Sequence, residues 1–516
     1  MANSKNLKKG LHTKTKNNVL IGIIVAVVIL TIVGYVIYVS GFLPSVMTGV
    51  KITKVNESGK TVVVDNVSVA ELNIHYFQVI NEYNATGALE TNGDLDAIDE
   101  TTGKTLRQQM TDKAAENIKN LYFLIEWGKA NISNFSDLEK VASHYMEISI
   151  DNLRDSAEKY NYPNLTTYLH AMYGTGCSLR VYRDTVQKEV LGELIQTYVQ
   201  QYNFGADREV LQQDFDANPL NYTRCDFNYY SFPADSTVNE DGEVEFDNTK
   251  ALENANYVAS KTTDSASFVL AVMDKIEDEE ELASFETATD DPTLMEGATN
   301  ISISGMAGGE ANDFLFEDGE IGTTKVIDMN SSVWVIFLKD RYMNDMPVVT
   351  YRTLVLYNDK KVANGDSEEE VAKSCDKLVE KANSIVASIT DEQSFATQVG
   401  LNSSNSNDIM TGGKSVGMTE KDFESTNGSE LPTGTRQLKE WAFDASRAHG
   451  DMTVIRNEGN TTVTIYYWVE SVPAWLYEAE QQVVATQYSE FAADPAVIPE
   501  SANVQIAYDL IKRLTY

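Results

Sequence analysis

Two segments of this chain, 313–340 and 440–471, repeat one order of residue types. Each contains a phenylalanine, a glycine-containing acidic turn, a short apolar stretch, a polar turn and a closing strand of alternating apolar residues. The copies lie more than 100 residues apart. That spacing is too long for the stacked units of a solenoid and indicates a duplicated domain. The chain is therefore constrained to contain two small α/β domains of one fold.

Both copies continue upstream of these segments with the same two features. A Gly-Met pair comes first, and an aromatic or aliphatic strand lies further upstream. These features are Gly305-Met306 and Phe227–Phe232 in the first copy, and Gly417-Met418 and Tyr351–Tyr357 in the second. We therefore expect the two domains at 222–345 and 346–473.

A long uncharged run follows a basic start. The first 18 residues carry five lysines and no acidic residue, and Val19–Val39 then runs for 21 residues without a charge. At about 1.5 Å per residue such a helix spans roughly 30 Å, the thickness of a bilayer core. We expect 1–18 to be a cytoplasmic tail and 19–39 a single-pass anchor in the cell membrane, with the rest of the chain outside the cytoplasm. The alternative is a cleaved signal peptide, whose apolar region is usually shorter.

The net charge restricts the partners of the chain. With 41 basic and 77 acidic residues the formal charge is −36, and the part beyond the basic tail carries about −41. Such a surface repels phosphate backbones, so we expect no nucleic-acid partner. It suits partners that are basic or unfolded. Three widely spaced cysteines, Cys177, Cys225 and Cys375, form no metal or redox motif, and we expect neither a metal nor another cofactor.

The remaining segments predict a mainly helical domain and a C-terminus that returns to it. Residues 40–65 predict a linker and a hairpin, and 66–221 carry apolar stripes at helical spacing. Residues 474–516 contain two amphipathic stretches, Trp475–Phe491 and Val504–Leu514, which we expect to be helices packed on the helical domain. The expected fold class is α+β: an N-terminal transmembrane helix, a helical domain, two tandem α/β domains and C-terminal helices.

The second copy resembles the parvulin domain of extracytoplasmic foldases, the PrsA- and SurA-like peptidyl-prolyl isomerases. The matching motifs follow the family order: Tyr351-Arg352-Thr353-Leu354-Val355, Ser394-Phe395-Ala396-Thr397-Gln398-Val399, Gly412-Gly413-Lys414-Ser415-Val416-Gly417-Met418, Trp441-Ala442-Phe443 and Val463–Val469. The first copy retains fewer of them. The resemblance implies two parvulin-like domains beside a SurA/PrsA-like helical chaperone domain.

Both copies lack the histidines that such a domain uses. In parvulins one histidine on the first strand and one on the last orient polar groups beneath the substrate proline. Here Arg352 or Thr353 stands at the first-strand position and Thr462–Ile465 at the last, and the first copy contains no histidine. His449 lies beside a turn glycine, where we expect a solvated side chain. Arg352 and Thr353 are the candidate catalytic positions, and the absent histidines indicate a binding fold without its chemistry.

Aromatic and apolar side chains of both copies are the expected peptide-binding groups. The candidates are Tyr229, Phe232, Leu354, Met418, Phe443 and Tyr466. Aromatic rings offer broad apolar contact at low entropic cost, which suits unfolded segments. We expect a membrane-anchored chaperone-like protein that binds unfolded or secreted polypeptides without isomerase catalysis. An active isomerase that uses the second copy, and an envelope scaffold that binds one folded partner, are the alternatives.

Overall fold

The computed structural model describes residue 31 and residues 42–87, 95–238, 244–424, 430–457 and 459–511. The basic tail and the anchor expected at 1–39 lie outside these ranges, apart from Thr31. Within the described ranges, no helix has both the length and the apolar composition that crossing a bilayer requires. The described chain is α+β, with long helices and several small antiparallel sheets.

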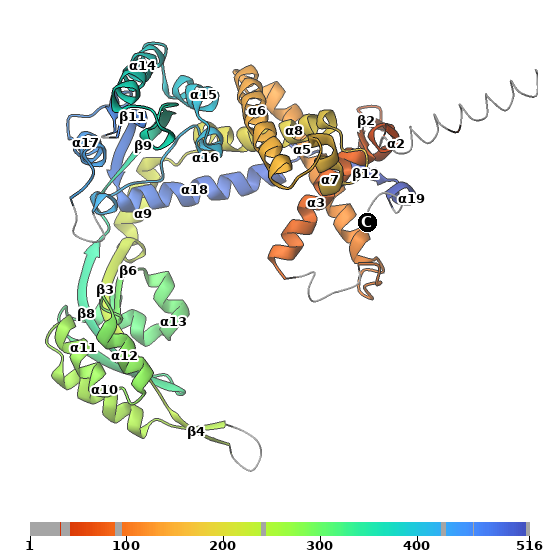
Figure 1. The fold of residues 1–516 in the computed structure, drawn as a ribbon. Coiled ribbons are helices and arrows are strands. Elements are labelled where there is room, and N and C mark those ends of the chain that lie inside the picture. Colours follow the sequence, from red (N-terminus) through yellow and green to blue (C-terminus); the bar gives the residue numbers. More distant parts are fainter. Residues whose placement is uncertain are drawn as a thin grey trace, which may run out of the picture.

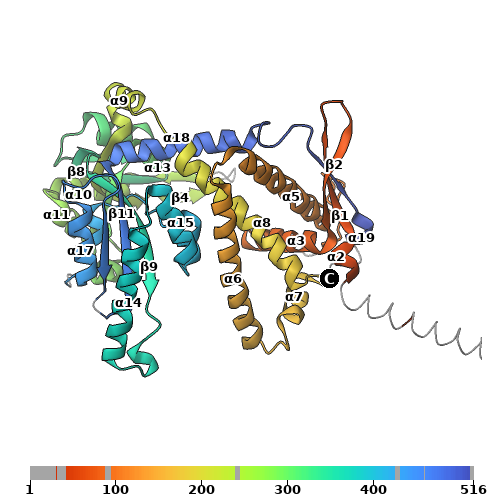
Figure 2. The same cartoon turned by 90° about the horizontal axis from the view of Figure 1, so that it is seen from above.

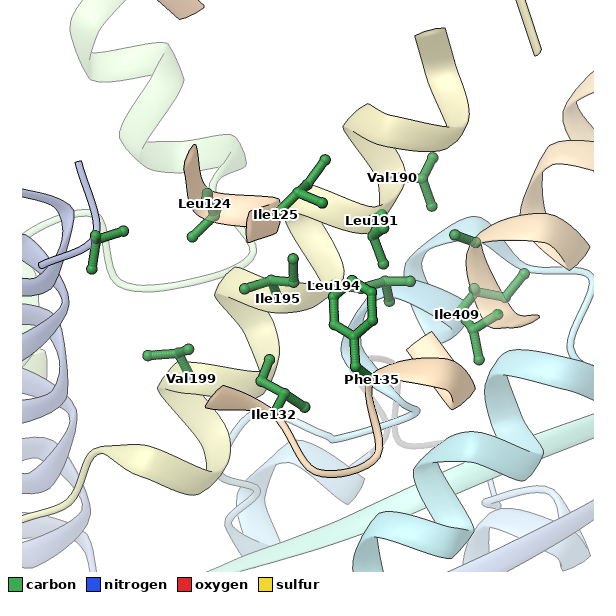
Figure 3. Close-up of a cluster of buried hydrophobic side chains, with 13 residues drawn as sticks. Leu124, Ile125, Ile132, Phe135, Val190, Leu191, Leu194, Ile195, Val199 and Ile409 are labelled. Carbon is green, nitrogen blue, oxygen red and sulfur yellow. The ribbon is translucent and has the colours of Figure 1, made fainter. Parts of the chain in front are cut away.

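A bundle of long helices forms a body at one end of the molecule (Figures 1 and 2). Its elements are α3 (Val69–Ala85), α5 (Leu106–Asn131), α6 (Phe135–Lys159), α7 (Leu165–Tyr173) and α8 (Leu179–Tyr198), continued by the π-helical turn η1 (Val199–Asn203). The Ser68 hydroxyl accepts a hydrogen bond from the Glu71 amide and caps the start of α3. The apolar stripes of α5 and α8 meet in one core, shown in Figure 3, where Leu124 and Ile195 are buried.

A small sheet beside this body joins sequence positions that are far apart. After α2 (Phe42–Val46), β1 (Thr48–Val55) pairs with β2 (Thr61–Ser68), which confirms the predicted hairpin. The other edge of β1 pairs with β12 (Asn503–Ile506). The prediction of a helix over 504–514 is therefore wrong at its start, because Val504 lies opposite Ile52 in this sheet. The helix there, α19, covers Tyr508–Ile511.

Residues 223–343 form an arm around an antiparallel sheet of order β6-β3-β8-β7 (Figure 1). The strands are β3 (Thr223–Pro233), β6 (Leu294–Ala298), β7 (Thr324–Asp328) and β8 (Ser332–Met343). Helices α10 (Thr249–Lys261) and α11 (Ser265–Met273) cover one face, and α13 (Asn300–Asp313) with η3 (Phe314–Asp318) covers the other. The arm also carries α12 (Glu279–Thr287) and the hairpin of β4 (Asp235–Val238) and β5 (Val244–Asp247).

Residues 347–473 form a second unit around a sheet of order β10-β11-β9. The strands are β9 (Pro347–Tyr357), β10 (Met452–Arg456) and β11 (Thr462–Pro473). The helices are α14 (Glu368–Val386), α15 (Glu392–Asn402), α16 (Ser406–Thr411) and α17 (Thr433–Ala442), with the short turns η4 (Val362–Asn364) and η5 (Glu420–Phe423). Two isolated bridges, Val349 to Met418 and Arg352 to Lys414, extend this sheet beyond β9.

The two sheets share one topology. In each, the first strand pairs antiparallel with the last strand, which also pairs with the strand before it. Segment 414–418 then stands beside β9 as β6 stands beside β3. The expected equivalence of Gly305-Met306 with Gly417-Met418 is wrong, because Gly305 and Met306 lie inside α13. The edge strand β6 is the true counterpart.

Helix α18 (Ala474–Ala493) runs from the sheet units to the helical body (Figures 1 and 2). At its start Trp475 stacks on Phe215 of α9 (Arg208–Ala217), with ring centroids 4.2 Å apart. Near its end Phe491 meets Trp127 of α5 at 4.8 Å. A C-terminal helix therefore packs back on the helical body, as the sequence predicts. The short turn η2 (Pro219–Tyr222) leads from α9 into the arm.

The two sheet units are attached to the rest of the molecule in different ways. Ile409 of α16 is buried in the apolar core of the helical body. Gly400 of α15 is so close to α6 that a Cβ on it would lie 2.6 Å from a methyl of Val141. The arm is attached instead near its connecting turn, where Tyr222 of η2 packs in the cluster around Trp475 and Arg224 of β3 forms an ion pair with Glu478 of α18. The second unit therefore shares a core with the helical body.

Candidate functional site

Arg352, a candidate catalytic residue, lies in β9 opposite Tyr467 and exposes none of its side chain. Each nitrogen of its guanidinium is engaged. The acceptors are Glu392 Oε1 at 2.9 Å, the carbonyl oxygens of Thr411 at 3.1 Å and Gly412 at 3.0 Å, Gln201 Oε1 at 2.8 Å and the Tyr202 hydroxyl at 3.0 Å. Because Gln201 and Tyr202 belong to η1, this network ties β9 to the helical body.

The charge of Arg352 is balanced inside the protein. Its Nη2 lies 2.8 Å from Oε1 of Glu392, whose side chain is 19% exposed. Burial raises the pKa of Tyr202 to about 12, so this hydroxyl stays protonated and neutral beside the guanidinium at neutral pH. The geometry is against the catalytic role considered for Arg352, because a closed and saturated guanidinium has no donor left for a substrate.

Thr353 and His449 are the other groups considered near this strand. Thr353 follows Arg352 on the opposite face of β9, and its amide donates to the Gly413 carbonyl at 2.8 Å. His449 is exposed, as expected, and both of its ring nitrogens lie within hydrogen-bond distance of a polar partner. Its Nδ1 lies 2.9 Å from the Val469 carbonyl oxygen and its Nε2 lies 3.2 Å from the Tyr467 hydroxyl. A carbonyl only accepts, so in the neutral ring Nδ1 carries the proton and Nε2 accepts from the tyrosine.

The glycine turn beside β9 has a steric cause. Gly413 has a φ of +71°, and a Cβ on it would lie 2.1 Å from the Thr353 carbonyl oxygen. We predict that Gly413→Ala lowers the free energy of unfolding by about 2–3 kcal/mol, measured by urea denaturation. Gly59→Ala is the matched control, because Gly59 has a φ of +74° with nothing within 4 Å, and should cost about 1 kcal/mol. Equal losses would contradict the steric explanation.

The six side chains expected to bind peptide do not share one groove. Phe232 and Leu354 are 4% and 0% exposed in the sheet cores, so neither presents a surface to a ligand. The prediction that Phe232 and Leu354 bind peptide is therefore wrong. Tyr229 lies on the opposite face of its sheet from Phe232, half-buried against Trp334. The remaining three pack half-buried around one cluster of the second unit; they are Met418, Phe443 and Tyr466.

Two cavities that the sequence did not predict open in the helical body. One, of about 530 Å³, is lined by β2, α3, α5, α6 and α8. The other, of about 520 Å³, is lined by α3, α5, α8, the end of α18 and residues 497–498. His75 and Leu121 line both, so the cavities adjoin. Leu121 can lie close to α8 because Gly192 has no side chain, and a Cβ there would lie 2.4 Å from Leu121 Cδ1.

No protein-family model matches the chain, and no curated protein matches it. Its function is therefore inferred from the residues and their geometry.

A histidine–glutamate pair stands where the cavities adjoin. His75 is 4% exposed and its Nδ1 lies 3.0 Å from Oε1 of Glu189, while Gln78 donates to Oε2 at 2.8 Å. Burial, with a smaller contribution from Lys188, lowers the pKa of His75 to about 4. Burial raises the pKa of Glu189 to about 7, against the Gln78 hydrogen bond. Both shifts favour the neutral forms, so near neutral pH this carboxyl is the group whose charge changes.

Proposed function

We propose that the chain is a membrane-anchored, extracytoplasmic chaperone-like protein that binds unfolded or secreted polypeptides without isomerase catalysis. The pair of adjoining cavities carries this proposal, because their walls combine apolar side chains with polar groups. Such mixed linings are typical of binding sites, and unfolded segments offer both kinds of group. The parvulin resemblance and the shared topology of the two sheets favour a foldase-like protein. The lysine-flanked run at 19–39 favours the membrane location.

The saturated hydrogen bonding of the Arg352 guanidinium favours binding over catalysis. Prolyl isomerisation breaks no bond, and a catalyst lowers a barrier of roughly 18–20 kcal/mol by favouring the twisted amide. That task needs a desolvated pocket with free donors aimed at the substrate. Around Arg352 the donors are already used by Glu392 and by backbone and side-chain oxygens of α16 and η1.

Suppression of aggregation tests the proposal. We predict that the full chain in detergent micelles lowers the light scattering of several unrelated denatured proteins at near-equimolar ratio. Leu121→Gln should weaken this effect several-fold, because Leu121 lines both cavities. Leu270→Gln is the matched control, since Leu270 is 64% exposed on the arm, and should leave the effect intact. Circular dichroism would verify that both variants are folded.

Two results would overturn the proposal. If the chain protects none of the unfolded proteins and binds one folded protein instead, the scaffold alternative holds. If the chain accelerates the isomerisation of a proline peptide, and Thr353→Ala abolishes the acceleration, the non-catalytic part fails. We expect no acceleration above the rate of the peptide alone.

A further inference from the structure

We propose that the two cavities form one site for polypeptide segments that combine lysine or arginine with apolar residues. This inference rests on the proposed function and names the substrate class of its site. We call this site the acidic cleft. It consists of all the residues that line either of the two cavities. Its apolar walls come from α5, α8 and the end of α18, and include Ile118, Leu121, Leu124, Leu191 and Phe491.

The first cavity has more acidic than basic groups. Its carboxylates are those of Asp65, Glu71, Glu126, Glu139 and Asp184. Its two lysines are already paired: Lys188 Nζ lies 2.7 Å from Glu71, and Lys129 Nζ lies 2.8 Å from Glu126. Asp65, Glu139 and Asp184 form no ion pair with any residue that the structure describes. Three negative groups at this wall are left for a ligand.

The second cavity repeats this arrangement. It is lined by Glu82, Glu189 and Glu193, and by no lysine or arginine of the described chain. Glu82 is paired with Lys113 at 2.5 Å, and Glu189 faces His75 at 3.0 Å and accepts from Gln78, which leaves Glu193 for a ligand. Glu193 projects from α8, as does Asp184, so these two unpaired carboxylates lie along one helix, beside Leu121 of α5 and Leu191 of α8.

The arrangement of these groups selects the occupant. A wall that carries both apolar and unpaired acidic side chains complements a segment that carries both apolar and basic side chains. An acidic segment would be repelled, which excludes one large class of clients. A divalent cation is a poor fit, because among the described residues no three acidic, histidine or cysteine side chains are grouped closely enough to hold a metal.

Peptide binding measured by fluorescence anisotropy tests the inference. The probes are three labelled peptides with the same leucines, alternating with lysine, with glutamate or with serine. We expect the full chain to bind the lysine peptide at least tenfold more tightly than the glutamate peptide, with an affinity that falls as salt is added. The double variant Asp184→Asn/Glu193→Gln should weaken lysine-peptide binding by about threefold to tenfold.

A matched control separates the acidic cleft from the overall charge of the chain. The double variant Glu253→Gln/Glu286→Gln removes the same charge from exposed residues of the arm. We expect it to bind the lysine peptide like the parent. An equal loss in both double variants would assign the binding to net charge and overturn the inference.

The remaining outcomes distinguish this inference from the proposed function. If all three peptides bind equally and aggregation is still suppressed, the proposed function stands and the preference for basic segments falls. If no peptide binds and aggregation proceeds, both fall. A peptide with the sequence of residues 1–18 serves as competitor. If it binds more tightly than the lysine–leucine peptide, the cleft holds the chain's own tail, and both the inference and the proposed extracytoplasmic location are overturned.

Discussion

Replacing Arg352 with methionine is expected to lower the free energy of unfolding by about 3–5 kcal/mol. Methionine fills much of the volume but leaves the Glu392 carboxylate largely buried without its cation. It also leaves the Gly412 carbonyl oxygen without the Arg352 donor, while the Thr411 carbonyl oxygen keeps the donor from Gln201. An uncompensated buried charge costs more than the lost attraction, because the carboxylate has given up water and gained nothing in return. Urea denaturation measures the loss.

The loss of stability in Arg352→Met should also begin in one part of the molecule. Arg352 joins β9 to Gln201 and Tyr202, so hydrogen exchange should rise at η1 and α16 before it rises in the arm. Arg154→Met is the matched control, since Arg154 and its partner Asp151 are 56% and 71% exposed, and it should cost less than about 0.5 kcal/mol. Adding Glu392→Gln to Arg352→Met should recover part of the stability. If Arg352→Met costs no more than Arg154→Met, the network does not hold the second unit on the body.

The sequence predicted a secondary-structure element correctly where the residues of that element alone determine its conformation. The expected helix at Trp475–Phe491 is α18, found at Ala474–Ala493, because an apolar stripe at helical spacing needs only its own residues to be recognised. The strand β12 was missed for the opposite reason. Asn503–Ile506 is a strand because β1 offers it a free edge, and β1 lies some 450 residues earlier in the chain.

The candidate site was also predicted incompletely, because it depends on residues that are far apart in the sequence. The sequence placed Arg352 on the correct strand, but its partners Gln201 and Tyr202 lie about 150 residues away, so neither its burial nor its saturation is visible in the local pattern. The cleft was missed because the stripes of α5 and α8 predict which side of each helix is apolar. They do not predict that Leu121 and Leu191 border cavities. A cavity is a property of several packed elements together.

Removing either member of the His75–Glu189 pair is expected to change the pH dependence of stability, with opposite signs. The stabilising contribution of Glu189, measured as parent minus Glu189→Gln, should be full below pH 4.5. It should be lost as pH rises towards 7, because the folded pKa lies above the unfolded one. The contribution of His75, measured as parent minus His75→Gln, should be full above pH 6.5. It should be lost as pH falls towards 4, because the folded pKa lies below the unfolded one.

Each change should amount to roughly 3 kcal/mol, since one pKa unit corresponds to about 1.4 kcal/mol. Urea denaturation of the full chain between pH 4 and 7.5 measures it, and taking differences from the parent cancels titrating groups that the variants share. The other charged groups near the pair are Glu71 on α3, and Lys188 and Glu193 on α8. Glu286→Gln, which removes an exposed carboxylate of α12, is the control variant.

The slopes of these two stabilising contributions against pH distinguish a buried neutral pair from a buried ion pair. If His75 and Glu189 were charged together in the folded protein, the pKa of histidine would be raised and that of the carboxyl lowered, and both slopes would reverse. Opposite slopes in the predicted sense would mean that desolvation outweighs the attraction at 3.0 Å. Glu189 would then gain its charge only near neutral pH. The acidic cleft would be most negative, and most suited to a basic segment, on the alkaline side of that transition.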